Sequence, residues 1–160
     1  MKRSLAVVAL LATWIAPAPA QQPADQVTYV DATKVAEAFA KGGALDTGSD
    51  HVASVLRRVK PGQVEVHTRE TDTFYIVDGT ATFVTGGTVV DQKEVRANQL
   101  TGTDIQGGQT HQLKKGDFIS IPAGIPHWFK DVPASGVTYY MVKVLKPQVS
   151  ARPPRRSRST

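Results

Sequence analysis

Short stretches in which apolar and polar residues alternate, separated by glycine-rich turns, make up most of the chain. A period of two is typical of a strand with one buried face. The turn signals include Pro61-Gly62, Asp78-Gly79 and the TGG run at 85–87. The predicted strands are 27–30, 51–59, 64–67, 73–77, 80–84, 88–90, 103–105, 110–113, 118–121 and 137–144. Many short strands without alternating helices predict an all-β sandwich or barrel, with a long polar loop over 91–102.

One segment departs from the strand pattern and predicts a single short helix near the N-terminus. Asp31 can cap a helix over 32–41, in which Val35 and Ala38 lie on the same face. Gly42 then supplies the stop.

The first 20 residues carry the pattern of a secretory signal peptide. Lys2 and Arg3 form a basic start, 5–15 is an apolar run, and Ala18-Pro19-Ala20 is a small-residue cleavage site. The apolar run is shorter than the roughly 20 residues that a membrane-spanning helix needs. We therefore expect cleavage after Ala20 and a secreted or periplasmic protein, with no transmembrane segment in the mature chain.

The basic charge of the chain lies mainly at its two ends. Of 19 Lys and Arg residues, two lie in the signal peptide and four in the last nine residues, which leaves 13 against 14 acidic residues in the body. A body so close to neutral gives no reason to expect a nucleic-acid partner. The tail at 149–160 has no apolar anchor and is predicted to be a disordered basic tail, so the folded domain is expected to cover 21–148.

The absence of cysteine restricts the chemistry open to this protein. With no Cys in the chain there is neither a disulfide nor a thiolate ligand nor a thiol nucleophile. No GxSxG, HExxH or phosphate-binding loop occurs either. A metal site would have to use histidine, carboxylate and water.

The stretch KGDFISIPAGIPHW, residues 115–128, places one histidine after a strand and two turns. Such a ring is either a buried hydrogen-bonding group or a metal ligand. Counted as Gly116, Pro122, Gly124 and His127, the spacing resembles the second motif of the cupin family. Asp131 stands where that family usually has Asn, a mild difference because both residues cap turns.

A first cupin motif is recognisable upstream, between Pro61-Gly62 and Asp78-Gly79. The family usually has His-x-His followed by Glu, and this chain has Glu65-Val66-His67 followed by Asp72 at these positions. The period of two places Glu65 and His67 on one face of a strand.

The resemblance implies a metal site of Glu65, His67, Asp72 and His127, with Glu70 as a spare candidate. Two imidazoles and two carboxylates would neutralise a divalent ion and suit Mn, Fe or Zn. The alternative is a metal-free barrel in which the acidic residues line a polar mouth.

Strand parity places several other side chains. His111 shares a face with Leu113 and is either an interior contact of the site or an ordinary polar residue, and His51 belongs to no motif. The residues expected to line the pocket, or else to be plain core, are Phe74, Ile76, Phe118, Ile121 and Trp128.

The resemblance covers about 27–144 and implies an all-β fold, a single cupin-type β-barrel or jelly roll with one short N-terminal helix. Because cupins include many activities, fold alone does not decide the function. The first hypothesis is a metal-dependent enzyme, dioxygenase- or isomerase-like, acting on a small organic substrate. The alternatives are a non-catalytic cupin that binds a small ligand or metal, and a structural cupin that pairs as a homodimer. No catalytic acid or base beyond the metal ligands can be named.

Overall fold

The computed structural model describes residues 26–146. The predicted signal peptide and basic tail lie outside the described residues. Within that range no helix has the length and apolar character needed to cross a bilayer.

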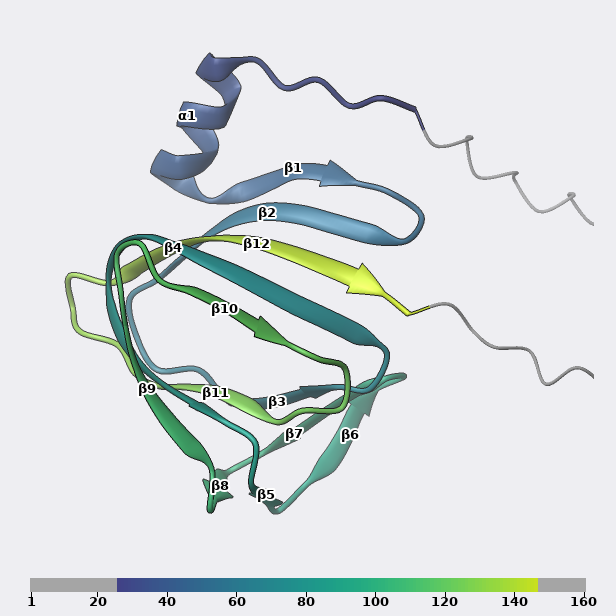
Figure 1. Cartoon of the computed structure of the whole chain (residues 1–160), viewed down its shortest axis with the longest axis vertical. Helices are drawn as coiled ribbons and strands as arrows, with labels where there is room; N and C mark the ends of the chain where they lie inside the picture. The colour runs from purple at the N-terminus through teal and green to yellow at the C-terminus, as the bar shows by residue number, and fades with distance from the viewer. Residues whose placement is uncertain (1–25, 147–160) are drawn as a thin grey trace, which may run out of the picture.

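The chain forms one helix and twelve strands over the described residues (Figure 1). In order they are α1 (Ala32–Lys41), β1 (Gly43–Thr47), β2 (His51–Arg58), β3 (Val64–His67), β4 (Glu70–Thr85), β5 (Thr88–Val90), β6 (Lys93–Arg96), β7 (Gln99–Gly102), β8 (Asp104–Gln106), β9 (Gln109–Lys114), β10 (Phe118–Ile121), β11 (His127–Asp131) and β12 (Val137–Leu145).

Strand β4 connects the two halves of the structure. Its first half pairs with β12 and β10, and its second half pairs with β9 and β11. The main sheet has the order β1-β2-β12-β4-β11-β3-β7-β6, all antiparallel, with β9 and β10 pairing β4 beside this path. Strands β5 and β8 form a separate two-stranded ribbon.

Gly79 lies where β4 changes partners. Its φ is +78°, and a Cβ at this position would collide with the carbonyl oxygen of Gly136. Only glycine fits both the left-handed backbone and the close approach of the neighbouring chain.

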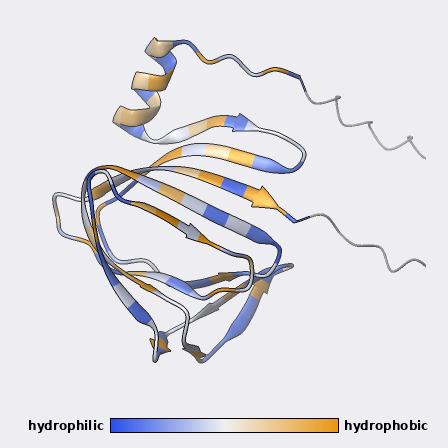
Figure 2. Ribbon diagram, viewed as in Figure 1, coloured by the Kyte–Doolittle hydropathy of each residue, from blue (hydrophilic) through white to orange (hydrophobic). Residues whose placement is uncertain are grey.

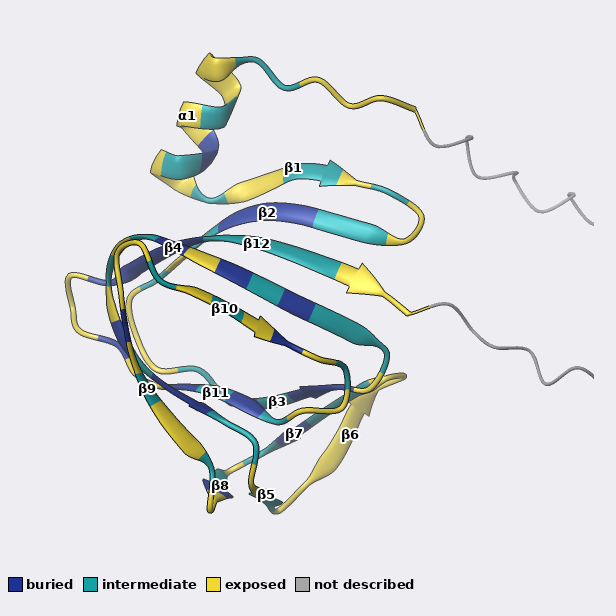
Figure 3. Ribbon diagram, in the orientation of Figure 1, coloured by how far each residue is buried: buried dark blue, intermediate teal, exposed yellow. Residues whose placement is uncertain are grey.

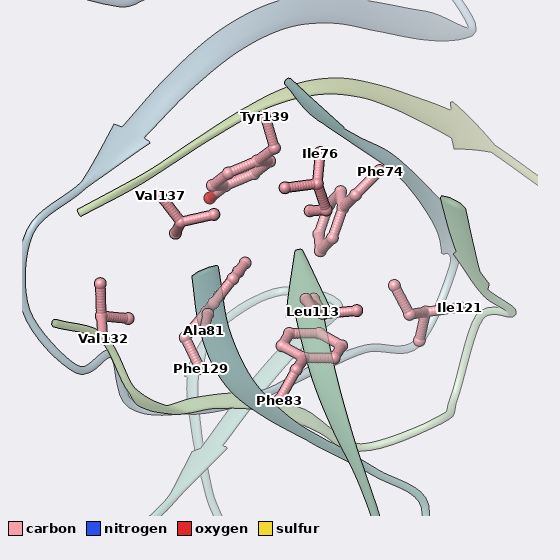
Figure 4. Close-up of a cluster of buried hydrophobic side chains, with 10 residues drawn as sticks. All are labelled: Phe74, Ile76, Ala81, Phe83, Leu113, Ile121, Phe129, Val132, Val137 and Tyr139. Carbon is pink, nitrogen blue, oxygen red and sulfur yellow. The ribbon is translucent and has the colours of Figure 1, made fainter. Parts of the chain in front are cut away.

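The strands curve around a core of ten buried side chains (Figure 4). These are Phe74, Ile76, Ala81, Phe83, Leu113, Ile121, Phe129, Val132, Val137 and Tyr139. Phe83 packs edge-on against Phe129 with ring centroids 4.7 Å apart, and Phe129 stacks on Tyr139 at 5.1 Å. Such offset and edge-on pairs add to the stabilisation from buried area.

The alternation expected of half-buried strands is visible along β4 in both hydropathy and burial (Figures 2 and 3). The all-β class and the single helix are confirmed. The helix has the predicted bounds, and Asp31 caps it by accepting hydrogen bonds from the amides of Thr33 and Lys34. The two strands predicted around Gly79 are one continuous strand.

Two sequence predictions were wrong, and four strands were missed. Residues 27–30 form no strand, since Val27 and Tyr29 are 98% and 86% exposed and have no sheet partner among the described residues. Residues 91–102 are not a loop but contain β6 and β7, whose turn uses Asn98 with φ +65°. The segment has a loop-like composition because all four residues of β6 are exposed at the sheet edge and are therefore mostly polar. Strands β1 and β11 have no alternating apolar run to reveal them.

Candidate metal centre

Strands β3 and β11 place three of the predicted ligands. Glu65 and His67 lie on the same face of β3, while Val64 on the other face packs into a second, smaller apolar cluster. His127 begins β11 and is the direct cross-strand partner of Glu65. Backbone pairing thus fixes the facing positions of these side chains.

Asp72 reaches the same point from β4, between two neighbouring strands. Its Cα partners are Ile121 on β10 and Lys143 on β12. Its side chain is only 3% exposed. The carboxylate therefore lies inside the protein, where an unpaired charge would be costly.

The polar atoms of the four predicted residues converge. Asp72 Oδ2 lies 3.5 Å from His67 Nε2 and 3.6 Å from His127 Nε2, and Glu65 Oε2 lies 3.9 Å from His127 Nε2. A tetrahedral ion with bonds of about 2.1 Å holds its ligand atoms about 3.4 Å apart. These three separations are close to this value, and the donor atoms that all lie within 4.8 Å of one another form groups of three rather than one group of four.

Two overlapping groups could hold an ion. One combines Glu65, His67 and His127, and the other combines His67 with Glu70 and Asp72. Glu70, the spare candidate, is therefore adjacent to the site. Its Oε2 lies 3.4 Å from His67 Nδ1, on the side of the ring away from Asp72.

The orientation of His127 is set by its backbone neighbour. Nδ1 lies 3.2 Å from the carbonyl oxygen of Ile125 and can donate to it, which leaves the lone pair on Nε2 directed at the site. Burial lowers the pKa of His127 below its usual value, although the Ile125 carbonyl and the nearby carboxylates of Asp72 and Glu65 oppose this shift. A neutral imidazole is the form that binds metal.

The ring of His67 lacks the backbone hydrogen bond that orients His127. Its Nδ1 is buried and has no hydrogen-bond partner, because the 3.4 Å contact with Glu70 lacks hydrogen-bond geometry. For Glu70, burial opposes ionisation, but the contacts with Lys143 and His67 outweigh it and place its pKa below the usual value. A negative Glu70 beside His67 favours the imidazole tautomer that donates from Nδ1.

Lys143 is a central residue of the site that sequence reasoning missed. Its ammonium lies 2.6 Å from Asp72 Oδ1 and 2.9 Å from Glu70 Oε2. Asp72 thus uses one oxygen for the lysine and directs the other at the two imidazoles. A signal exists in the sequence, because Lys143 has the inward parity of Tyr139 and Met141 on the same strand.

A cavity of about 230 Å³ opens onto these groups. Its walls are Leu56, Arg58, Glu65, His67, Asp72, Phe74, Arg96, Gln99, His127, Phe129, Tyr139, Met141 and Lys143. Burial raises the pKa of the Tyr139 hydroxyl, and Arg58 offsets part of that rise. Tyr139 is therefore a hydrogen-bond donor at neutral pH.

Of the predicted pocket residues, only Phe74 lines this cavity. Ile76 and Ile121 belong to the same buried core as Phe74 but do not reach the cavity wall. Phe118 is 67% exposed on the outer face of β10. Trp128 points the other way, and its indole donates to the carbonyl oxygen of Gly62.

The two remaining histidines lie outside the cavity wall. The ring of His111 is 2.8 Å from the hydroxyl of Thr85 and lines a different hollow, beside β10. His51 lies between Asp46 and Asp50, which raise its pKa through hydrogen bonds. Neither histidine contacts Glu65, His67, Asp72 or His127. This agrees with the alternative that both are ordinary polar residues.

Comparison with known proteins links this architecture to solved structures. No family model matches the chain, and no curated protein matches its sequence. A protein from Bacillus halodurans superposes with a TM-score of 0.53 at 14% identity, over 82% of this chain and 86% of the other. The cupin domain of Cnp3 from Schizosaccharomyces pombe gives 0.48 at 15% identity, over 66% of this chain. This match spans 60% of the Cnp3 chain, less than two thirds of its length.

A third similar structure is a double-stranded β-helix protein from Klebsiella pneumoniae, with a TM-score of 0.44 at 16% identity over 64% of this chain and 69% of the other. At these identities the likeness concerns the fold. The fold is shared with the Bacillus halodurans structure over most of both chains, and the resemblance to cupins rests on the two sequence motifs.

Proposed function

We propose that this chain is a metal-dependent enzyme, dioxygenase- or isomerase-like, that acts on a small organic substrate outside the cytoplasm. The observation that supports it is the position of Asp72 Oδ2 at the wall of a cavity, 3.5 Å from His67 Nε2 and 3.6 Å from His127 Nε2. A divalent ion held there would supply Lewis-acid or redox chemistry. The cavity of about 230 Å³ is smaller than the range typical of drug-sized ligands, which favours a small substrate.

The residues around the ligand set have separable roles in this proposal. Lys143 holds one oxygen of Asp72, so that the other oxygen is directed at the imidazoles. Tyr139 keeps its proton because burial raises its pKa, and it can donate a hydrogen bond to a substrate oxygen. The apolar wall, which includes Phe74, excludes water from the reacting groups.

The alternative is a non-catalytic cupin that binds a small ligand or a metal. It is supported by Lys143, whose ammonium contacts both Asp72 and Glu70 and balances one of their two negative charges without any metal. A site balanced in this way would be stable as a metal-free binding pocket.

Metal binding and turnover separate these proposals. Protein purified without a histidine tag is titrated with Mn²⁺, Fe²⁺ and Zn²⁺ by calorimetry, and its metal content is measured. His67→Ala and His127→Ala should each lower affinity by at least about tenfold, since each removes one donor. His51→Ala is the matched control, because it removes a histidine that does not contact the four ligand candidates.

The enzyme proposal also requires catalytic turnover. Loaded protein should turn over a member of a panel of small organic substrates, with O₂ consumption if the ion is redox-active, and both histidine variants should lose that turnover. Stoichiometric metal without turnover of any substrate would favour the binding alternative. Absence of stoichiometric metal would overturn both metal-based forms.

Secretion and assembly also stay proposals. Export is expected from the signal sequence at 1–20. A homodimer is supported by the cross-strand partners Tyr75 and Phe118, which are 48% and 67% exposed on the outer face of β4 and β10. Light scattering that gives the mass of one chain would overturn the dimer.

A further inference from the structure

The cavity wall contains an arginine that forms no ion pair with the other residues of the site. Arg58 ends β2 and faces the same side as Leu56, which also lines the cavity, whereas its neighbour Arg57 is exposed. Within the part of the chain that the structure describes, Arg58 forms no ion pair, and its Nε is buried without a hydrogen-bond partner. Arg58 is partly buried, and a buried N–H without a partner carries a desolvation cost that an anionic ligand would relieve.

The other charges of the site are already paired. Lys143 is bound by Asp72 and Glu70, and Glu65 approaches His127. Arg96 is exposed at the rim, where its Nε donates to the side-chain oxygen of Gln99. The three cationic groups equal the three carboxylates in number, so a bound divalent ion would leave the pocket with two excess positive charges.

The guanidinium is also held in a defined position. It lies over the ring of Phe129, with Cζ 5.0 Å from the ring centroid. It is close enough to the Tyr139 hydroxyl to oppose the effect of burial on the pKa of that group. An arginine fixed on an aromatic face presents its remaining N–H groups in one plane, the arrangement that binds a carboxylate through two hydrogen bonds.

We propose that Arg58 is the anion-binding residue of this cavity, and that the ligand is a small organic carboxylate whose apolar body lies against the wall of Phe74, Phe129 and Met141. The carboxylate accepts from Arg58 and from the Tyr139 hydroxyl. The rest of the molecule extends toward Glu65, His67, Asp72 and His127. This inference rests on the proposed function for its reactive end, but carboxylate recognition itself requires only Arg58 and Tyr139.

The test compares an acid with its neutral analogue of nearly the same shape. Benzoate and benzamide are titrated by calorimetry into the Zn²⁺-loaded and the metal-free protein. Benzoate should bind at least about tenfold more tightly than benzamide, since a charge-assisted bidentate pair is roughly twice as strong as neutral hydrogen bonds. Added salt should reduce this preference.

Two substitutions at neighbouring positions give a matched comparison. Arg58→Gln should reduce the acid-to-amide ratio to about one, while Arg57→Gln on the outer face of β2 should leave it unchanged. Arg58→Lys keeps the charge without the planar fork, so it should give an intermediate ratio, and it provides the measurement if Arg58→Gln does not fold. Equal binding of the two probes to wild type, failure of both to bind, or an unchanged ratio in Arg58→Gln would each overturn the proposal.

Failure of this inference is distinguishable from failure of the metal proposal. Arg58→Gln should bind Zn²⁺ as wild type does, because Arg58 is not among the ligand candidates. If wild type binds no metal but prefers benzoate through Arg58, the carboxylate inference stands without the metal enzyme. If Arg58 serves only to pack on Phe129, Arg58→Gln lowers the melting temperature without changing the ratio.

Discussion

Lys143 acts as an internal counterion for Asp72, and replacing it should expose how the site is balanced. The two residues are direct cross-strand partners on β12 and β4, with side chains 17% and 3% exposed and a 2.6 Å contact. Lys143→Met keeps the length of the apolar stem and removes the charge. Asp72 is then left with the two imidazoles and no full positive charge.

The expected loss follows from this burial. Removing one partner of a buried pair typically costs 3–5 kcal/mol because the remaining charge is uncompensated. Lys143 is not fully buried, so we expect a loss of about 3 kcal/mol in the presence of chelator, at the lower end of that range. For a domain of this size that corresponds to a fall of about 10 °C in the melting temperature.

A divalent ion should rescue the variant. At one hundred times its Kd, a ligand that binds only the folded protein stabilises it by about 2.7 kcal/mol. Since the ion would replace the missing cation beside Asp72, the rescue should be larger in Lys143→Met than in wild type. Urea unfolding with chelator and with Zn²⁺ gives both free energies.

Two comparisons decide the interpretation. In an Asp72→Asn background, Lys143→Met should cost clearly less than in wild type, because only Glu70, the more exposed of its two carboxylate partners, then remains. Lys130→Met is the surface control and should change stability by less than about 1 kcal/mol, since Lys130 and Asp104 are about half exposed. If Lys143→Met is as stable as wild type in chelator, or if its cost is unchanged by the Asp72→Asn substitution, then Lys143 does not act through Asp72.

Three further predictions concern pH, backbone and export. Burial lowers the pKa of His127 below 6.5, so the stabilisation from its neutral form is present above pH 6.5 and is lost as pH falls toward the lowered pKa. Urea unfolding of metal-free protein should therefore show a free energy of unfolding that falls with pH in wild type and not in His127→Gln, and the same pH dependence in both would contradict this prediction. Gly79→Ala should lower the free energy of unfolding by at least about 2 kcal/mol, against about 1 kcal/mol for Gly107→Ala, because both glycines have positive φ but of the two only Gly79 lies against a neighbouring backbone. Equal losses in chemical denaturation would contradict this reason. Intact mass of exported protein should correspond to a start at Gln21, and retention of 5–15 would contradict cleavage after Ala20.

The parts of the fold that the sequence predicts well are those in which one strand face is buried. Alternation reveals β2, β3 and β10, whereas Gly79, predicted as part of a turn, lies within the continuous strand β4. Spacing within the two motifs brings together Glu65, His67, Asp72 and His127. These features depend on local periodicity, which a single sequence records.

Features that depend on contacts between distant strands could not be predicted in this way. Lys143 is inward by parity, but its pairing with Asp72 requires the register of β12 against β4. Phe118 has the pattern of a pocket residue, but β10 pairs with the first half of β4 in a register that leaves this side chain 67% exposed. The edge strand β6 has the composition of a loop because exposure on both faces removes the alternation.

The continuity of β4 through both halves also limits how the protein can move. Strand β12 pairs with its first half and β11 with its second, so the strands that carry Lys143 and His127 are hydrogen-bonded to one continuous element. The two halves are therefore expected to unfold as one cooperative unit, with β4 amides exchanging with solvent only through global unfolding. Ligand access would then depend on the β6–β7 hairpin, the exposed edge that carries Arg96 and Gln99, whose amides should exchange much faster than those of β4.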